Sequence, residues 1–147
     1  MIVRQATVED VDQIAPLFDG YRQFYGREPD LGAARAFLLD RFKNNQSTIF
    51  MAAKDSSSVL GFMQLYPSFS SVSLAKTLIL NDLFVVPEAR RGGVATALLE
   101  AAARFGRSIE AIRLTLTTGI ANESAKALYV SQGWKQDEAF HVFHLGL

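Results

Sequence analysis

The residues best suited to chemistry form a short basic turn, Arg90-Arg91-Gly92-Gly93, between an apolar segment and an amphipathic one. The first N–H groups of a helix have no partner within the helix, and the helix dipole adds partial positive charge at that end. Glycines at such a junction let a ligand approach the backbone closely. The pattern therefore predicts a site for a phosphate or diphosphate. The alternative is a solvated turn that simply begins a helix.

Two known phosphate motifs do not fit this turn. The P-loop ends in Gly-Lys-Ser/Thr, whereas Val94 follows Gly93. The dinucleotide fingerprint needs three spaced glycines and an acidic residue about 20 positions later. Gly92-Gly93-Val94-Ala95 does not supply that spacing. A nucleotide-binding protein is therefore a rival hypothesis that neither of these two motifs supports.

Hydrophobic periodicity predicts the elements that must position the turn. A helix is expected after Thr7, with Val11, Ile14 and Phe18 on one face and Asp10 at its start. Further helices are expected over 31–44, 92–107 and 122–132. Strands are expected over 2–6, 47–54, 59–66, 77–86 and 111–117, with a loop at 67–76 and one or two closing strands within 134–147. This order describes one mixed α/β domain covering residues 1–147.

The composition, 49% hydrophobic and 20% charged, is that of a globular domain. Fifteen basic residues balance fifteen acidic ones, so no overall field favours nucleic acid or an anionic membrane. The absence of cysteine excludes disulfides and a cysteine nucleophile. His141 and His144 would point to opposite faces of a strand, so no metal site is expected. No segment has the pattern of a signal peptide or membrane span, and the expected location is the cytosol.

Three motifs carry a resemblance to a known family. Arg90, Gly93 and Ala95 match Arg/Gln-x-x-Gly-x-Gly/Ala, and the strand before them reads Asp82-Leu83-Phe84-Val85-x-Pro87. The third motif is Asn122-x-x-Ala125-x-x-Leu128-Tyr129-x-x-x-Gly133-Trp134. Together with the order of elements, these motifs resemble the GNAT superfamily of N-acetyltransferases over roughly residues 2–146. The Asp-Leu-Phe-Val strand is most similar to the histone and polyamine branch.

The resemblance implies a fold and a cofactor. The fold is a GNAT fold of the α/β class, with a central, mixed and mostly antiparallel sheet of six to seven strands, splayed at its central strand and flanked by four helices. The cofactor is acetyl-CoA, whose diphosphate would be held at the turn and whose pantetheine arm would lie along the central strand. We therefore expect the ladder between the strands at 77–86 and 111–117 to part at the C-terminal end of the former. The cofactor-binding residues that the resemblance implies are Leu83, Phe84, Val85, Arg90, Arg91, Gly92, Gly93, Val94, Ala95, Thr96, Asn122, Ala125 and Tyr129.

The resemblance also implies direct attack of a primary amine on the acetyl thioester in a ternary complex. Tyr129 occupies the position of the family's general acid, although the helical spacing also fits core packing. The branch places a glutamate before the strand aspartate, and here that position is Asn81, which cannot take a proton. Asp82 is the candidate base or amine-binding group; the alternative is a strand-end carboxylate bound to nearby backbone.

Tyr21 and Tyr25 lie where the family places its acceptor wall, and with Asn81 and Asp82 they form the expected acceptor site. Their helical spacing fits core packing equally well. The expected acceptor is a small-molecule amine, such as a polyamine, or a lysine-like amine. The rival from another class is a catalytically silent acyl-CoA-binding module of the same fold. The apolar C-terminal segment, with Phe140, Val142, Phe143 and Leu145, favours a homodimer.

Overall fold

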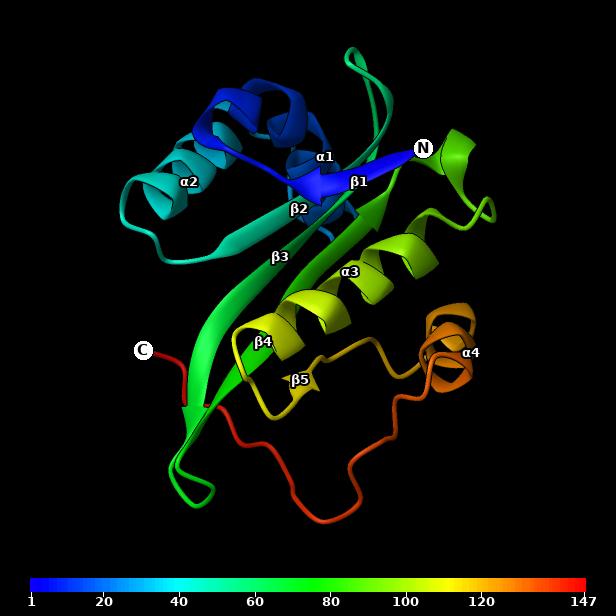
Figure 1. The fold of residues 1–147 in the computed structure, drawn as a ribbon. Coiled ribbons are helices and arrows are strands. Elements are labelled where there is room, and N and C mark those ends of the chain that lie inside the picture. Colours follow the sequence, from blue (N-terminus) through cyan, green and yellow to red (C-terminus); the bar gives the residue numbers. More distant parts are fainter. The chain divides into compact units, whose positions relative to one another are not determined.

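A computed structural model describes all residues from Met1 to Leu147 (Figure 1). The chain forms two compact units, Met1–Thr117 and Thr118–Leu147. The first unit holds five strands and three α-helices, and the second holds the fourth helix and the C-terminal segment. The four helices agree with the expectation, and a single domain over 1–147 stays a prediction.

The sheet has five strands in the order β1-β2-β3-β4-β5. Each of the first four pairs with its neighbour antiparallel, and β5 pairs with β4 in parallel. The sheet is therefore mixed and mostly antiparallel, as expected. The strands are β1 (Ile2–Gln5), β2 (Thr48–Asp55), β3 (Ser58–Ser70), β4 (Ala75–Val85) and β5 (Leu114–Thr115).

The predicted count of six to seven strands is wrong. Residues 134–147 form no strand, and the large apolar side chains of this segment, such as Phe143 and Leu145, are exposed. An apolar composition favours a strand only where a neighbouring strand offers backbone partners and a surface to pack on. The predicted loop at 67–76 is also too long, because β3 and β4 continue through most of it and leave only 71–74 between them. Pro67 is tolerated in β3 because the β2–β3 ladder extends only as far as Leu65. Pro67 therefore pairs with β4 alone.

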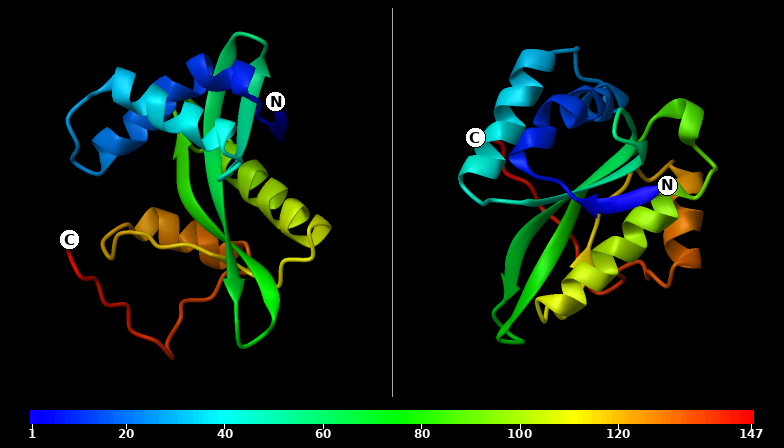
Figure 2. Two further views of the ribbon diagram at one scale, coloured as in Figure 1. Left: turned by 90° about the vertical axis from the view of Figure 1, so that its left-hand side faces the viewer. Right: turned by 45° about the horizontal axis from the view of Figure 1, so that its top comes forward.

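Within the first unit, helices cover both faces of the sheet (Figures 1 and 2). One face carries α1 (Val11–Phe24) and α2 (Leu31–Lys43), and the other carries α3 (Val94–Ser108). The core under α1 and α2 centres on Ile14, Leu38 and Phe62, all fully buried. α1 buries Val11, Ile14 and Phe18, the residues expected on one face of this helix.

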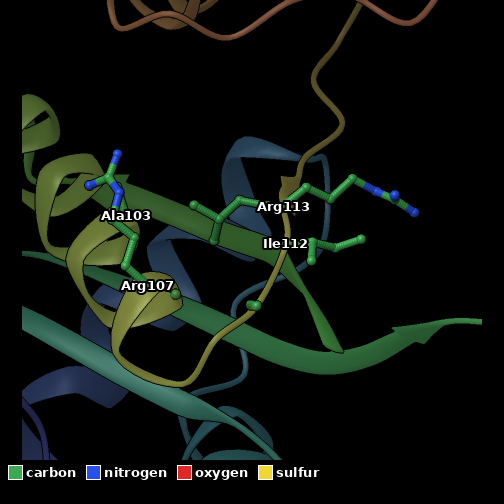
Figure 3. A pocket seen from close by; sticks show the side chains of 7 residues that line it. Ala103, Arg107, Ile112 and Arg113 are labelled. Atoms are coloured by element: carbon green, nitrogen blue, oxygen red, sulfur yellow. The ribbon is translucent and has the colours of Figure 1, made fainter. Parts of the chain in front are cut away.

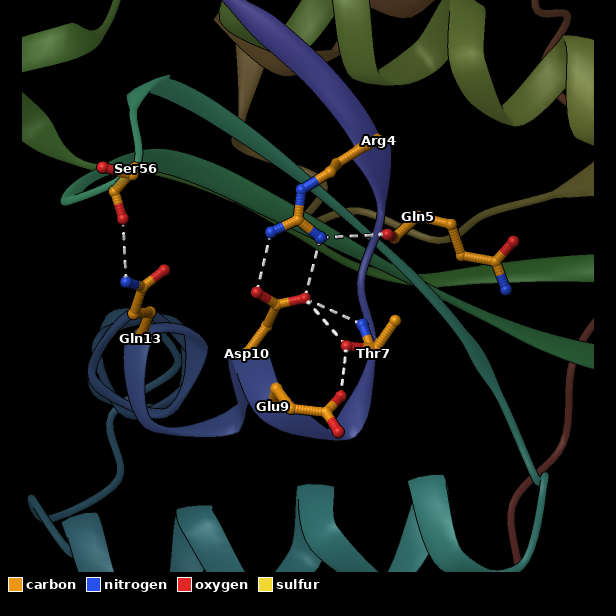
Figure 4. A network of polar contacts seen from close by, with 7 residues as sticks. All are labelled: Arg4, Gln5, Thr7, Glu9, Asp10, Gln13 and Ser56. Atoms are coloured by element: carbon orange, nitrogen blue, oxygen red, sulfur yellow. Dashed lines mark hydrogen bonds and ion pairs between the residues drawn. The ribbon is translucent and has the colours of Figure 1, made fainter.

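A polar network anchors the N-terminal strand to the start of α1 (Figure 4). The Arg4 guanidinium donates to both oxygens of Asp10, at 2.7 and 2.8 Å. The backbone N–H of Thr7 donates to the same carboxylate at 2.8 Å, which is one half of the predicted capping box. The hydrogen bonds from Arg4, more than any other cause, lower the pKa of Asp10 to about 2, below its ordinary value of 3.8.

The second unit contains α4 (Glu123–Ser131) and the segment that follows it. The side chain of Asn122 caps this helix by accepting a hydrogen bond from the N–H of Ala125 at 3.3 Å. Gly133 ends the helix in a left-handed conformation, with φ of 90°. The predicted helix over 122–132 is therefore confirmed, with a structural reason at each end.

None of the helices has the length and apolar character needed to cross a membrane.

Candidate active site

The turn between β4 and α3 presents a row of backbone donors. A 3-10 turn, Pro87–Ala89, follows β4, and α3 begins at Val94. The first backbone bond of α3 runs from the N–H of Ala97 to the carbonyl of Gly93 at 3.0 Å. No side chain caps this helix, and the N–H groups from Arg91 to Thr96 donate to no other group of the protein. These donors are available to an anion, which is what the turn must offer if it binds a phosphate.

Two residues of the turn adopt left-handed backbone conformations. Arg91 has φ of 63° and Gly93 has φ of 83°. Successive backbone N–H groups in a turn can face one point and so form an anion-binding concavity. Glycine adopts this conformation freely, whereas an arginine loses about 1 kcal/mol in it. The turn therefore holds a strained conformation at the point where an anion would bind, as functional sites often do.

Arg90 holds the turn against the end of β4. Its Nε donates to the carbonyl of Val85 at 2.9 Å, and its guanidinium lies 5.4 Å from the centre of the Phe84 ring. This arginine is thus not an unattached cation of a solvated turn. It links the turn to the C-terminal end of β4.

The edge of β4 that faces β5 is free of strand pairing over its C-terminal half. The β4–β5 ladder consists of Leu78 opposite Leu114 and Ile79 opposite Thr115, and it ends there. On its other side, β4 stays paired with β3 as far as Val85. The predicted parting of the ladder is confirmed. Apart from the Val85 carbonyl, which accepts from Arg90, backbone groups of Leu83, Phe84 and Val85 on this side can therefore pair with an extended, amide-bearing ligand as an added strand.

A β-bulge interrupts β4 at Asn81. Gln64 of β3 lies opposite Asp82, the next β3 residue lies opposite Leu80, and Asn81 is left as the extra residue. The hydroxyl of Tyr21 in α1 donates to the backbone carbonyl of Asn81 at 2.8 Å. The structure therefore brings Tyr21, Asn81 and Asp82 together, as the acceptor-site hypothesis expects. The bulge itself was not foreseen, because it depends on the register with a distant strand.

Asp82 is a buried carboxylate, 1% exposed, on the sheet face covered by α1 and α2. One of its oxygens accepts from Nε2 of Gln64 at 2.6 Å, and the other from Nδ2 of Asn81 at 2.8 Å. The alternative hypothesis, a carboxylate bound to nearby backbone, is therefore wrong, because both partners of Asp82 are side-chain amides. Burial raises the pKa of Asp82 above its ordinary value of 3.8, and the two amide donors act in the opposite direction.

Sequence reasoning missed the residues that surround this carboxylate. Gln64 is fully buried, and its Oε1 accepts from the hydroxyl of Ser47 at 2.7 Å. Burial, with the charge of Asp82 as a second cause, raises the pKa of Tyr66 to about 12, and Arg41 opposes this rise. One signal could have identified Gln64: it is the one polar side chain in the run Leu60-Gly61-Phe62-Met63-Gln64-Leu65.

The tyrosines expected to form the acceptor wall lie in one aromatic cluster. The rings of Tyr21 and Tyr25 are 5.1 Å apart, and Tyr21 also contacts Phe18 and Phe62. Tyr21 thus packs on the core and reaches the bulge, and its role in the acceptor wall stays a prediction. Tyr25 is half exposed and extends the cluster towards solvent.

Tyr129, the predicted general acid, belongs to the second unit. It lies on α4, and its ring centre is 6.1 Å from that of Trp134. Asn122 and Ala125, expected to bind cofactor, form the N-terminal cap of the same helix. The Asn122 side chain and the Ala125 N–H bond to each other in that cap, and this explains this part of the motif without a ligand.

A pocket of about 160 Å³ lies in the first unit at the C-terminal end of α3 (Figure 3). Two arginines lie at this pocket, but the side chains of Arg107 and Arg113 extend in different directions. None of the predicted site residues lines it. Its lining consists of Ala103, Gly106, Arg107, Ala111, Ile112, Arg113 and Leu114.

Comparison with known proteins gives the same family as the motifs. A sequence model described as the acetyltransferase (GNAT) family matches residues 13–134, which includes the turn and Tyr129. An uncharacterized N-acetyltransferase of Bacillus subtilis (strain 168), YhfO, is 46% identical over 140 residues, which cover 95% of this chain and 93% of that protein. A probable acetyltransferase of Haemophilus influenzae is 29% identical over 138 residues, covering 94% and 92% of the two chains.

A solved structure agrees over the full length. The crystal structure of a probable acetyltransferase superposes with a TM-score of 0.95 at 42% identity and covers 100% of this chain and 98% of its own. None of these three names specifies an acceptor.

Proposed function

Since this chain belongs to the GNAT family of acetyltransferases, we propose that it transfers the acetyl group of acetyl-CoA to a primary amine. The observation that carries the choice of donor is the row of N–H groups from Arg91 to Thr96 that have no partner in the protein. A diphosphate bound there would satisfy several of them at once.

The edge of β4 supports the same donor. Acetyl-CoA, when bound, supplies an acetyl thioester at the end of an amide-bearing arm. Leu83, Phe84 and Val85 lie beyond the end of the β4–β5 ladder and can pair with that arm. A backbone N–H of Phe84 or Val85 is the proposed donor to the thioester oxygen, where negative charge develops during attack.

Asp82 is the proposed base or amine-binding group. A primary alkyl amine with a pKa of roughly 10 is mostly protonated at neutral pH and must lose a proton before it attacks. In the proposed reaction that proton passes to Asp82, directly or through water. The amine nitrogen bonds to the acetyl carbon, the carbon–sulfur bond breaks, and the sulfur leaves with the electron pair. A carboxylate whose pKa is raised by burial is a better proton acceptor than an exposed one.

Tyr129 is the proposed acid, whose hydroxyl would give a proton to the departing sulfur. The support is its place in the Asn122–Trp134 motif and the match of the family model to residues 13–134. Asn122 and Ala125 enter the proposal through their cap, which sets the start of the helix that carries Tyr129.

The proposed acceptor is a cationic amine, either a small molecule such as a polyamine or a lysine-like side chain. Tyr21, Tyr25, Asn81 and Asp82 form the proposed acceptor site. A buried anion beside aromatic rings favours a cation over a neutral or acidic acceptor. The histone and polyamine branch stays a prediction, as do the cytosolic location and the homodimer.

Binding of CoA tests the proposal, and glycine substitutions give a matched pair of variants. Gly93 and Gly26 both adopt a left-handed φ, 83° and 84°, and a Cβ added at either meets no atom within 4 Å. Gly93→Ala and Gly26→Ala therefore cost similar backbone strain. Calorimetry with CoA should show uptake by the wild type and the Gly26 variant, and binding at least tenfold weaker for Gly93→Ala. Equal binding by all three, or none by the wild type, would contradict the proposal.

Thiol release separates transfer from silent binding. Acetyl-CoA is incubated with 1,4-diaminobutane, an aminoglycoside, alanine, lysine or a lysine-containing peptide. Release of CoA that depends on one of these amines supports the enzyme. Tight CoA binding with no amine-dependent release would favour the acyl-CoA-binding module. Competition by ATP or NAD for the CoA site would favour a nucleotide-binding protein.

A further inference from the structure

We propose that Gln64, held in place by Ser47, is a positioning residue that fixes the carboxylate of Asp82 for the acceptor amine. The inference rests on the proposed function in one respect only, namely that Asp82 serves the amine. The arrangement of Ser47, Gln64 and Asp82 does not depend on that role.

Gln64 lies in surroundings that would otherwise suit an apolar residue. It is fully buried in β3, directly opposite Ile49 of β2 on one side and Asp82 of β4 on the other. A buried amide without partners costs about 1–3 kcal/mol. Both ends of the Gln64 amide are satisfied, at 2.6 Å by Asp82 and at 2.7 Å by Ser47. The buried amide of Gln64 is therefore hydrogen-bonded at both ends, which is consistent with a role in holding the Asp82 carboxylate.

The hydrogen bonds define one orientation of the amide. An ionised carboxylate can only accept, so the NH₂ group of Gln64 must face Asp82. The amide oxygen then faces Ser47, whose hydroxyl must donate. Ser47 thereby opposes rotation of the amide, which would otherwise turn its oxygen towards the carboxylate. The chain Ser47–Gln64–Asp82 has a single polarity while Asp82 is charged.

The same chain sets the direction of the carboxylate. Gln64 donates to one oxygen of Asp82 and Asn81 to the other, so the two bonds resist rotation of the group. Both bonds also favour the charged form, and so they counteract the effect of burial on the pKa. The other ionisable groups near this face come from three elements: Tyr66 on β3, Tyr21 on α1 and Arg41 on α2. The hydrogen bonds to the Asp82 carboxylate come from the side chains of Gln64 and Asn81.

The direct test is the titration of Asp82 in the full chain. Carbon-13 NMR of carboxyl-labelled aspartate follows the group, and its signal is the one that Asp82→Asn removes. Gln64→Leu and Ser47→Ala are compared with Ile49→Val. Ile49 is as buried as Gln64 and lies opposite it in β2, so the Ile49 variant loosens the same packing without touching the polar chain.

Removal of the Gln64 donor should raise the pKa of Asp82 by about one unit, and removal of Ser47 should raise it by less. Ile49→Val should leave it unchanged. A base must be ionised to act, so the rising limb of kcat/KM against pH should move upwards by the same amounts. The assay uses the most active amine of the thiol-release panel. At a pH below the limb, a shift of one unit is a tenfold loss of rate.

An unmoved titration in both Gln64→Leu and Ser47→Ala would overturn the inference, as would an equal shift in Ile49→Val. Ser47→Ala decides the matter if Gln64→Leu does not fold, since Ser47 is only partly buried. A wild type that binds no CoA and releases no thiol contradicts the proposed function instead. The NMR titration still reports on the positioning of Asp82 in that case.

Discussion

Gly20 of α1 lies directly against the ring of Phe84 in β4. A Cβ at Gly20 would be 3.0 Å from Cζ and 3.2 Å from Cε1 of that ring. Phe84 packs on the core with its side chain, while its backbone belongs to the edge proposed to hold the acyl arm. The helix that carries Tyr21 therefore approaches the proposed thioester site through a residue without a side chain.

Gly20→Ala should lower activity without unfolding the protein. Alanine favours the helix by about 1 kcal/mol over glycine, and this gain offsets part of the cost of displacing the Phe84 ring. We expect the free energy of unfolding to change by less than about 1 kcal/mol. We expect kcat/KM to fall at least fivefold, because small displacements at a reacting centre are costly. Urea unfolding and steady-state kinetics measure the two effects.

Gly32→Ala is the matched control for this prediction. Gly32 also lies in a helix, α2, but a Cβ there meets only Asp30 at an ordinary 3.9 Å. This variant should be more stable by about 0.5–1 kcal/mol and fully active. Equal activity of the two variants would show that the Gly20–Phe84 contact does not matter for the site.

Asp10→Asn should remove a contribution to stability that the wild type has at neutral pH and loses in acid. The folded pKa of Asp10 is about 2, below its ordinary 3.8, so its contribution is present above about pH 4 and is lost as pH falls towards 2. At neutral pH the variant should be less stable by about 1–2 kcal/mol, because a charged hydrogen-bonded pair is broken. The gap between wild type and variant should close between pH 4 and pH 2. Urea unfolding at several pH values measures it.

Asp12→Asn provides the comparison for Asp10. Asp12 also pairs with an arginine, Arg35, at 2.6 Å, but both side chains are largely exposed. Exposed pairs contribute little to stability. A loss at Asp12 as large as that at Asp10 would contradict the assignment of the acid-dependent stability to the Arg4–Asp10 pair.

The sequence predicted those features that depend on neighbouring residues. The apolar periods identified all four helices and the first five strands, and the glycines located the turn before α3. Gly93 is left-handed as a glycine readily is, whereas nothing in the sequence indicates that Arg91 adopts the same conformation. The parting of β4 from β5 was expected from the family resemblance rather than from the residues.

Features that depend on distant pairing were not predicted. The bulge at Asn81 and the placement of Gln64 opposite Asp82 follow from the register of two strands, which local sequence does not specify. The prediction of closing strands within 134–147 was wrong because it relied on local composition alone. That segment has the composition of a strand, but strand propensity cannot form a strand where no ladder pairs with it.

Asp82→Asn should change the pH dependence of stability in the opposite sense to Asp10→Asn. The folded pKa of Asp82 is raised, chiefly by burial, so the folded state keeps a proton that the unfolded state has lost above about pH 4. The stability of the wild type therefore declines as pH rises through the folded pKa. Asparagine does not ionise, so the variant lacks this decline. The difference in unfolding free energy should shift in favour of the variant from pH 4 to pH 8.

The same variant should lose activity if Asp82 accepts the proton of the amine. A rising limb of the pH–rate profile that persists in Asp82→Asn would exclude Asp82 as the base. A difference in unfolding free energy that stays constant from pH 4 to pH 8 would show that burial of this carboxylate does not perturb its titration.

Tyr129→Phe should reduce turnover at least tenfold and leave acetyl-CoA binding unchanged. The substitution removes one hydroxyl and keeps the ring that packs 6.1 Å from Trp134, so α4 should fold as before. A general acid typically contributes a factor of about 100 to 10,000, and a thiolate is a good enough leaving group to place the expected effect at the lower end. Calorimetry with acetyl-CoA and the rate of thiol release are the two measurements. Turnover equal to that of the wild type would remove Tyr129 from the mechanism, and weaker binding with unchanged turnover would make it a cofactor contact instead.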